Sequence, residues 1–454
     1  MTSIYDKVLT IYKEKYLCSE CLGRLFALLG TSTTNKKRGT SLLLSLTMEN
    51  HAKYLTNEKE QEKIGIEKLK TLAEKARYPP AQRVLEKEGV PFNIPKSLEK
   101  CHLCDGLFLN LSPFVEKAKG KMEGFEFANF LVGTSLNPKI INREDILKSK
   151  FNLINSESFK SHFNRRVGKL LAEEFRKPVE FANPEITFIF KVNLNDFELN
   201  LIIKSLFIFG RYNKMIRNIP QTHWLCKKCH GKGCEACEYK GKMYETSVEE
   251  LISLEFVKAA EASGSKFHGA GREDIDVRML GKGRPFVIEL LDPKKRELDL
   301  SKIQDIVNQK NPDKVKIRSL RLSNKDEVIS IKAQAEDTKK VYSAIVESSE
   351  ALERTDFNQK LSDLKLQLEN KKLDQRTPIR VSHRRADKIR EKNIFDIKGE
   401  YLDSKSYKFE IKTQGGTYIK ELIDGDGGRT SPSFSEIFGM ELKCKKLDVI
   451  EIFY

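Results

Sequence analysis

One carboxylate in this sequence stands in a setting that suits a nucleophile. Asp274 follows Arg272 by two residues, in a stretch punctuated by glycines at positions 269, 271, 281 and 283. Glycines permit a sharp loop that a ligand can approach closely. A neighbouring opposite charge keeps a carboxylate ionised, as a nucleophile must be. The same residues would also fit an ordinary Arg–Asp ion pair on a surface turn.

Two later stretches add an aromatic ring and a lysine. The first, Lys340-Val341-Tyr342, opens the run VYSAIV, which we expect to be helical, and a tyrosine at such spacing usually belongs to a core. The second, GGTYIKEL, sets Lys420 beside an aromatic–aliphatic pair and precedes a glycine loop that ends in Arg429. Such a lysine suits a carboxylate or a phosphate, but it could also lie exposed at the edge of an element.

Eight of the nine cysteines fall into Cys-x-x-Cys pairs. One tandem repeat, CKKCHGKG followed by CEACEYKG, provides Cys226, Cys229, Cys234 and Cys237. Four thiolates that converge on one point suit tetrahedral zinc. A redox dithiol is the competing interpretation. The first repeat also resembles the zinc repeats of DnaJ chaperones, which leaves a peptide-binding module open.

The other two pairs are Cys18/Cys21 and Cys101/Cys104, separated by about 80 residues, which is wider than zinc-ribbon spacing. We interpret them as a bipartite zinc site that clamps the N-terminal helices to the next module. Two buried pairs of thiols are the alternative. Because four thiolates leave no open position on the metal, both sites are expected to be structural, with one or two zinc ions and no cofactor for catalysis.

The composition indicates a polyanionic partner. The 454 residues carry a formal net charge of +16, with an isoelectric point near 9.2. A basic excess of this size favours nucleic acid. The N-terminus lacks the apolar core of a signal peptide, and every apolar run is shorter than the roughly 18 to 20 residues that span a bilayer. We therefore expect a cytoplasmic protein with no membrane partner.

The elements that must position these residues indicate an α+β protein. Residues 1–74 are expected to be helical and zinc-clamped, and 75–205 to form a module of helices and strands. Residues 206–245 hold the second cysteine set, and 246–454 form the last domain, so the main boundary lies near 245. There KVKIRSLRLS, EVISIKAQAED, SYKFEIKTQ and LDVIEIFY are expected to be strands, and residues 350–373 an amphipathic helix.

These motifs together resemble a known enzyme superfamily. GREDIDVRMLG resembles the pseudouridine synthase motif Gly-Arg-x-Asp, GGTYIKEL resembles a motif of its TruB branch, and Lys-x-Tyr resembles the element that supplies the active-site tyrosine. With GRYNK, RTPIRVSHRRAD and GDGGRT, the pattern is similar to the archaeal-type tRNA pseudouridine synthases of the TΨC arm. That family carries an N-terminal zinc site, which the pairs Cys18/Cys21 and Cys101/Cys104 would provide. It also carries a THUMP-type RNA-binding module, which residues 75–205 would provide.

The resemblance implies a role for each matching residue. Asp274 would be the catalytic aspartate and Lys420 its basic partner, while Tyr342 would pack on the target base. Ile419 and Leu447 would form an apolar wall, and Arg272 would act in the gap that the flipped base leaves. Separately, the clustered positive charges of an accessory insert favour contacts with RNA phosphates, although they would also fit a solvated helix face. The arginines concerned are Arg376, Arg380, Arg384, Arg385 and Arg390.

The sequence thus predicts a monomeric enzyme that isomerises uridine at tRNA positions 54, 55 or both. Its catalytic domain would hold a mixed or antiparallel sheet, with tRNA as partner and no nucleotide cofactor. One rival is a non-catalytic RNA-binding or RNA-folding protein on an inactive synthase domain. The other is a DnaJ-like peptide-binding module, whose client binding would survive loss of Asp274.

Overall fold

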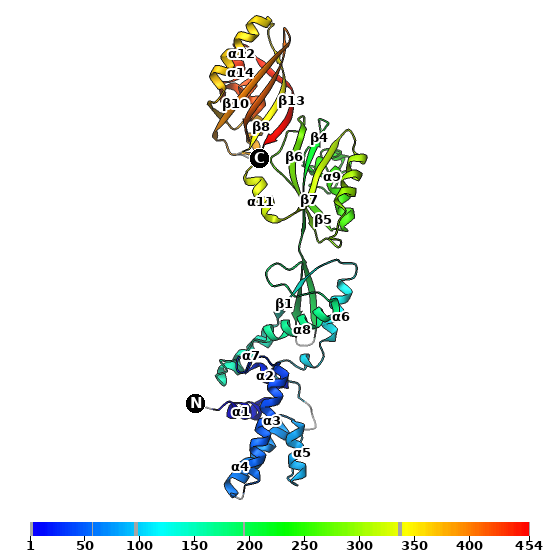
Figure 1. Cartoon of the computed structure of the whole chain (residues 1–454), viewed down its shortest axis with the longest axis vertical. Helices are drawn as coiled ribbons and strands as arrows, with labels where there is room; N and C mark the ends of the chain where they lie inside the picture. Colours follow the sequence, from blue (N-terminus) through cyan, green and yellow to red (C-terminus); the bar gives the residue numbers. More distant parts are fainter. Residues whose placement is uncertain (1–2, 57, 95–98, 194–195, 335–337, 454) are drawn as a thin grey trace. The chain divides into compact units, whose positions relative to one another are not determined.

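The structure, a computed structural model, describes residues 3–56, 58–94, 99–193, 196–334 and 338–453. The chain divides into two compact units, Met1–Ile203 and Lys204–Tyr454 (Figure 1). Within the described ranges no helix is both long and apolar enough to cross a bilayer.

The first unit begins with a group of helices and ends with a small three-stranded sheet. The early helices are α1 (Ile4–Glu14), α2 (Ser19–Arg24), α3 (Asn35–Tyr54), α4 (Lys59–Lys70) with the π-turn η1 (Thr71–Lys75), α5 (Pro79–Lys87), η2 (Leu107–Leu109) and α6 (Ser112–Lys121). The later elements are β1 (Phe130–Leu136), α7 (Pro138–Lys150), α8 (Phe159–Phe175), β2 (Ile186–Val192) and β3 (Phe197–Ile203).

Burial in this unit follows the periodicity of each element. Phe163, Val167 and Leu171 recur every four residues on α8 and are all fully buried, as expected for the apolar stripe of a helix. On β2, alternate residues from Ile186 to Val192 are buried, as the two-residue period of a strand requires. Strand β2 pairs parallel to β1 and antiparallel to β3. Helices and strands are therefore both present within residues 75–205, as expected from the sequence.

The second unit is built on a ten-stranded sheet. Its strands are β4 (Leu206–Lys214), β5 (Gly264–Gly269), β6 (Arg278–Leu291), β7 (Val315–Ser323), β8 (Lys339–Ser348), β9 (Lys372–Arg376), β10 (Ile389–Asp403), β11 (Ser406–Gln414), β12 (Thr430–Ser431) and β13 (Leu442–Phe453). The order is β12-β9-β10-β11-β8-β13-β6-β4-β7, with β5 also paired to β6. The two halves of the sheet meet where β13 runs parallel to β6, at Asp448↔Arg278 and Val449↔Met279.

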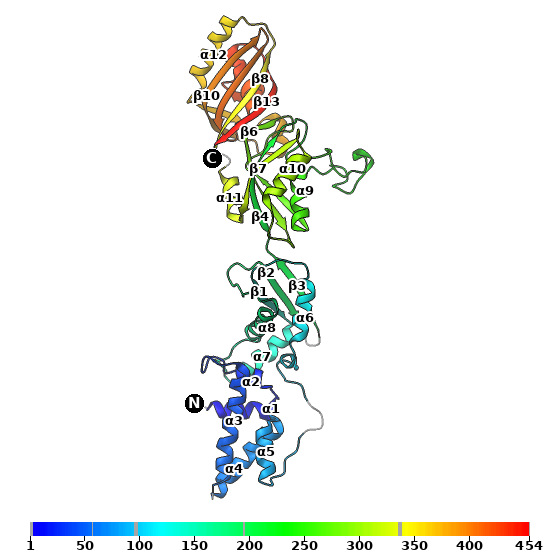
Figure 2. The same ribbon diagram turned by 45° about the vertical axis from the view of Figure 1, so that its right-hand side comes forward.

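Helices cover the faces of this sheet. They are α9 (Val248–Ala260), α10 (Leu300–Lys310), α11 (Lys325–Ala333), α12 (Arg354–Leu368), α13 (Ile419–Asp424) and α14 (Phe434–Phe438), with the short turns η3 (Glu235–Cys237), η4 (Ile379–Arg384) and η5 (Asp426–Gly428). Helix α12 lies along β10 (Figures 1 and 2). Its Phe357 stacks on Tyr407 of the neighbouring strand β11, with ring centroids 4.8 Å apart. The mixed α+β fold expected from the sequence is confirmed.

Three local expectations differ from the structure. The run VYSAIV is not helical but lies in β8, where alternate side chains are buried between β11 and β13. The expected strand at EVISIKAQAED is wrong too, because Asn324 caps a helix, α11, that buries Val328 and Ile331 one turn apart. Finally, β4 pairs with β6 and β7, so the boundary expected near 245 falls inside the second unit. The four-part division of roles stays a prediction.

Candidate active site

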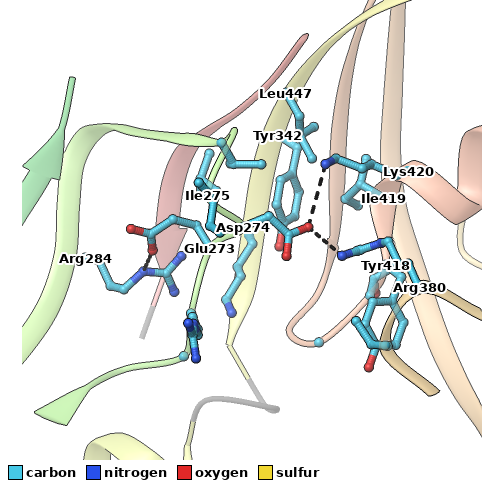
Figure 3. Close-up of a pocket in the computed structure, with 18 of the residues that line it drawn as sticks. Glu273, Asp274, Ile275, Arg284, Tyr342, Arg380, Tyr418, Ile419, Lys420 and Leu447 are labelled. Atoms are coloured by element: carbon cyan, nitrogen blue, oxygen red, sulfur yellow. Dashed lines mark ion pairs between the residues drawn. The ribbon is translucent and has the colours of Figure 1, made fainter. Parts of the chain in front are cut away.

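A pocket of about 500 Å³ opens in the second unit, close to where the two halves of the sheet meet. Its walls come from segments far apart in the sequence: the loop between β5 and β6, strands β8 and β13, the turn η4 and the start of α13. Figure 3 shows the side chains that converge there. The pocket brings together Asp274, Tyr342, Ile419, Lys420 and Leu447, which the sequence predicted as one site.

Asp274 lies on the loop between β5 and β6, with its side chain about one-third exposed. Among the side chains that the structure describes, its nearest cation is Arg380, whose Nη1 lies 2.9 Å from Asp274 Oδ2. Lys420 approaches the same oxygen at 3.8 Å (Figure 3). The carboxylate thus faces two fixed positive charges within the pocket.

The lysine expected to pair with Asp274 makes its shortest contacts elsewhere. Nζ of Lys420 lies 2.8 and 2.7 Å from the two carboxylate oxygens of Asp276. Lys420 therefore bridges Asp276 and Asp274, with the closer approach to Asp276. Arg380, which the sequence placed among the phosphate contacts, is the closer cation of Asp274 in this structure.

A buried lysine holds the main chain of the Asp274 loop. Lys214 ends β4 and is fully buried. Its ammonium donates to the carbonyl oxygens of Ile219 at 2.7 Å, Asp274 at 3.2 Å and Ile275 at 2.8 Å. Burial lowers the pKa of Lys214 from 10.5 to about 8, and the neighbouring carboxylates oppose that shift. Three carbonyls match the three protons of an ammonium, so the charged lysine ties the main chain of Asp274 and Ile275 to that of Ile219.

A second buried network supports the same loop. Glu273 forms an ion pair with Arg284 at 2.8 Å, and both side chains are almost completely buried. The hydroxyl of Tyr212 donates to Glu273 at 2.9 Å, and Gln221 donates to Tyr212 at 2.7 Å and to the carbonyl of Gly271 at 3.0 Å. Glu273 points toward Arg284 on one side of the loop, and the adjacent Asp274 points the other way, toward Lys420 and Arg380 (Figure 3).

The apolar side of the pocket is formed by three residues that the sequence singled out. Tyr342 on β8, Ile419 at the start of α13 and Leu447 on β13 are all buried and line the pocket. Burial raises the pKa of Tyr342 to about 12, so its hydroxyl is neutral at physiological pH. A flat ring flanked by aliphatic groups is a suitable surface for a planar base.

Lys340 lies two residues before Tyr342 and therefore on the same face of β8. It is buried and lines the pocket. Burial and the nearby charge of Arg284 lower the pKa of Lys340 to about 7. The motif Lys-x-Tyr thus places both of its polar side chains at the pocket.

The arginines expected to contact RNA are placed in different environments. Arg380 and Arg385 line the pocket, and Arg385 donates to the hydroxyl of Tyr418 at 3.0 Å. Arg376 pairs with Asp387 at 2.7 Å, and Arg390 donates to the hydroxyl of Thr377 at 2.9 Å. The side chain of Arg384 lies outside what the structure describes.

Arg272 is exposed and its guanidinium carbon lies 4.9 Å from the ring centre of Trp224. Both residues line the pocket. Trp224 stands at the base of the second cysteine segment, and nothing in its local sequence singled it out. Its presence in the pocket is one of the features that the motifs did not reveal.

Each cysteine tetrad converges in space. The sulfurs of Cys18, Cys21, Cys101 and Cys104 lie within 4.8 Å of one another, as do those of the second set, Cys226, Cys229, Cys234 and Cys237. The Sγ atoms of Cys18 and Cys104 are 3.7 Å apart, and those of Cys229 and Cys237 are 3.8 Å apart. A tetrahedron with Zn–S bonds of about 2.3 Å has edges of about 3.8 Å. Both tetrads are therefore compatible with a bound metal such as zinc.

Two further residues were missed by sequence reasoning: Tyr418, which lines the pocket, and Lys214, which holds the Asp274 loop. Tyr418 was part of a quoted motif, yet its ring lies 6.0 Å from the guanidinium carbons of both Arg380 and Arg385. Lys214 was noted in GRYNK without a role. A lysine in the same two-residue register as Ile208 and Tyr212, at the end of a buried strand, is a signal that could have identified it.

Comparison with known proteins gives the family. A family model described as "Pus10, C-terminal" matches residues 207–452, and one for the archaeal Pus10 THUMP domain matches 114–191. Proteins named tRNA pseudouridine synthase Pus10 are similar over nearly the whole chain. The one from Methanothrix thermoacetophila is 37% identical, covering 96% of this chain and 91% of its own. The protein of Methanocaldococcus jannaschii is 40% identical, over 97% of this chain and 93% of its own. That of Pyrococcus furiosus is 35% identical, over 99% of this chain and 98% of its own. The chain therefore belongs to the Pus10 family.

Proposed function

We propose that this chain is a tRNA pseudouridine synthase that isomerises uridine in the TΨC arm, at positions 54, 55 or both. One observation carries the proposal: the carboxylate of Asp274 stands in a pocket beside Arg380, Lys420 and the ring of Tyr342. Family membership supplies the reaction class, and Asp274 is the group proposed to perform it.

The chemistry suits these residues. Pseudouridine formation breaks the bond between N1 of uracil and C1′ of the ribose, turns the base and joins C5 to C1′. The base loses a proton from C5 and gains one on N1, so no redox partner or nucleotide cofactor is needed. An ionised Asp274 attacks the sugar or the base, or abstracts a proton while stabilising a transient sugar species. Tyr342, Ile419 and Leu447 receive the extruded base, which offsets part of its unstacking cost.

The remaining parts of the chain are assigned to binding and support. Residues 75–205 act as a THUMP-like module that binds tRNA, after the zinc-clamped helices of 1–74. Residues 206–245 form a zinc knuckle that precedes the catalytic domain of 246–454. Each tetrad holds one structural zinc, because four thiolates leave no open position on the metal. The insert arginines Arg376, Arg384, Arg385 and Arg390 contact phosphates, and the protein acts as a cytoplasmic monomer.

The test is to map the product. Unmodified tRNA is incubated with the wild-type chain or with Asp274→Ala, and pseudouridine is located by carbodiimide-dependent stops of primer extension. We expect stops in the T-loop for the wild type alone. Stops elsewhere would contradict the proposed substrate position. Activity that survives Asp274→Ala would contradict the role of Asp274, and a wild type without activity would favour a non-catalytic RNA-binding protein.

A further inference from the structure

Trp224 has no part in the proposed reaction, yet it lines the pocket that holds Asp274. We propose that Trp224 is a stacking platform for an RNA nucleobase that neighbours the target uridine, a role that rests on the proposed function. In this arrangement the second cysteine knuckle, defined as residues 226–241, serves to hold that platform at the rim of the pocket.

The surroundings of the indole ring are those of a stacking site. Trp224 is half-buried, so part of its ring is open to the pocket. The guanidinium of Arg272 lies 4.9 Å from the ring centre, and Tyr244 meets the ring system at 78° with centroids 5.6 Å apart. A planar cation at this distance occupies the position that a planar base would take.

The knuckle fixes the backbone that carries the ring. The amide of Met243 donates to the carbonyl of Trp224 at 2.9 Å, and the amide of Cys226 donates to that of Gly241 at 2.8 Å. Trp224 is thus two residues from a cysteine of the metal-binding tetrad and hydrogen-bonded across the root of the knuckle. Figure 2 shows this segment as the green loop that projects beside α9 and α10. A ring held on a rigid base loses little freedom when a ligand stacks on it.

The same segment is tied to the catalytic loop. Gln221, three residues before Trp224, donates to the carbonyl of Gly271 at 3.0 Å, and Gly271 directly precedes Arg272. The platform therefore has a fixed place relative to Arg272 and Asp274. When a base stacks on the ring, the guanidinium of Arg272 leaves the ring face and pairs with a phosphate of the same RNA strand.

Stacking on an aromatic side chain does not depend on base identity, because every base has a π-face. Each such contact strengthens binding by roughly 5- to 150-fold. The proposed ligand is therefore any nucleobase adjacent to the target, and the contribution of the platform is affinity and register rather than recognition of one base.

The chain contains a single tryptophan beside 13 tyrosines, so fluorescence excited at the long-wavelength edge, where only indole absorbs, reports on this ring alone. Asp274→Asn protein, which binds without turnover in our scheme, is titrated with unmodified tRNA while binding is followed independently by filter retention. We expect saturable quenching with the same midpoint as binding. A series of tRNAs with one abasic nucleotide near the target then identifies the stacked base: quenching should be lost at one position.

Variants provide the second readout. Trp224→Ala should raise KM for tRNA by roughly 10-fold, and Trp224→Phe should restore most of the loss because it keeps a ring. The matched control is Tyr239→Ala, which removes an exposed aromatic of the same knuckle that does not line the pocket and should leave KM unchanged. Metal content is measured for each variant, so that loss of the knuckle is recognised.

The outcomes separate this proposal from the function on which it rests. If tRNA binds and the wild type forms pseudouridine while Trp224 fluorescence stays constant, the platform is contradicted and the function stands. The platform is also contradicted if quenching persists at every abasic position, or if Trp224→Ala leaves KM unchanged with its metal retained. A chain that binds no tRNA would overturn both.

Discussion

The guanidinium of Arg380 lies 2.9 Å from the carboxylate of Asp274, closer than any other cation that the described part of the chain brings to that residue. The same guanidinium contacts the buried Glu421 at 2.5 Å. Arg380 therefore bridges two carboxylates and belongs to the pocket, although it stands in an arginine-rich segment that resembles a phosphate-binding surface.

Replacing Arg380 by Gln should lower kcat by about 10- to 100-fold, because Asp274 loses the group that fixes its position. Binding of tRNA should change much less. The matched variant is Arg376→Gln in the same insert, which should weaken tRNA binding and reduce its salt dependence while leaving kcat nearly intact. Single-turnover rates and filter binding at several salt concentrations measure both effects. If Arg380→Gln alters only the affinity, Arg380 is a phosphate contact.

Lys214 should act through the loop that it holds. Lys214→Met removes the ammonium that contacts the carbonyls of Asp274 and Ile275, and we expect kcat to fall by about 10- to 100-fold with little change in tRNA affinity. A variant that keeps the wild-type kcat would show that the loop holds its shape without this contact.

The pH dependence follows from the same group. The pKa of Lys214 is about 8 in the fold and 10.5 ordinarily. Above pH 8 the folded chain loses the proton, so one of the three carbonyl contacts is lost and kcat should decline. Stability changes in the opposite sense: between pH 8 and 10.5 the unfolded state binds more protons, so this group's contribution to the free energy of unfolding rises with pH. Rate and denaturation profiles should therefore diverge in this window, and a kcat that stays constant to pH 9.5 would contradict this role.

The cysteine tetrads should each hold one zinc ion. Cys226→Ser and Cys101→Ser should each lower bound zinc by about one equivalent per chain. Cys444→Ser is the matched control, since Cys444 belongs to neither tetrad, and its zinc content should equal that of the wild type. Elemental analysis of the purified proteins gives the answer. Full metal content in either tetrad variant would rule out zinc ligation by that tetrad.

Much of the pocket could be predicted because its key residues sit in short motifs. Asp274, Tyr342, Ile419 and Lys420 were identified from three strings, and the structure brings them together. Short apolar runs were less informative, because periodicity cannot separate a buried strand from a helix over six residues. The run VYSAIV forms a strand because it lies between β11 and β13, and its own sequence does not contain that information.

The sequence did not predict that Arg380 and Trp224 lie at the pocket, because contacts between residues distant in sequence place them there. The turn that carries Arg380 is fixed by a hydrogen bond of 3.0 Å from the amide of Ile379 to the carboxylate of Asp426. This contact links segments that are distant in sequence, so local composition predicts only a basic surface. Trp224 is likewise held at the pocket by the backbone of the cysteine knuckle and by the contact of Gln221 with Gly271. Neither contact can be predicted from the residues around Trp224, so the sequence does not show that its ring lies at the pocket.

The most direct test of the central claim compares two neighbouring carboxylates. Asp274 and Asp276 both contact Lys420, yet only Asp274 is proposed to react. Single-turnover formation of pseudouridine in unmodified tRNA is measured for Asp274→Asn and Asp276→Asn, with tRNA binding confirmed for each. We predict that Asp274→Asn lowers the rate by roughly a thousandfold or more, and Asp276→Asn by less than about tenfold. A rate for Asp274→Asn within tenfold of the wild type would contradict the assignment.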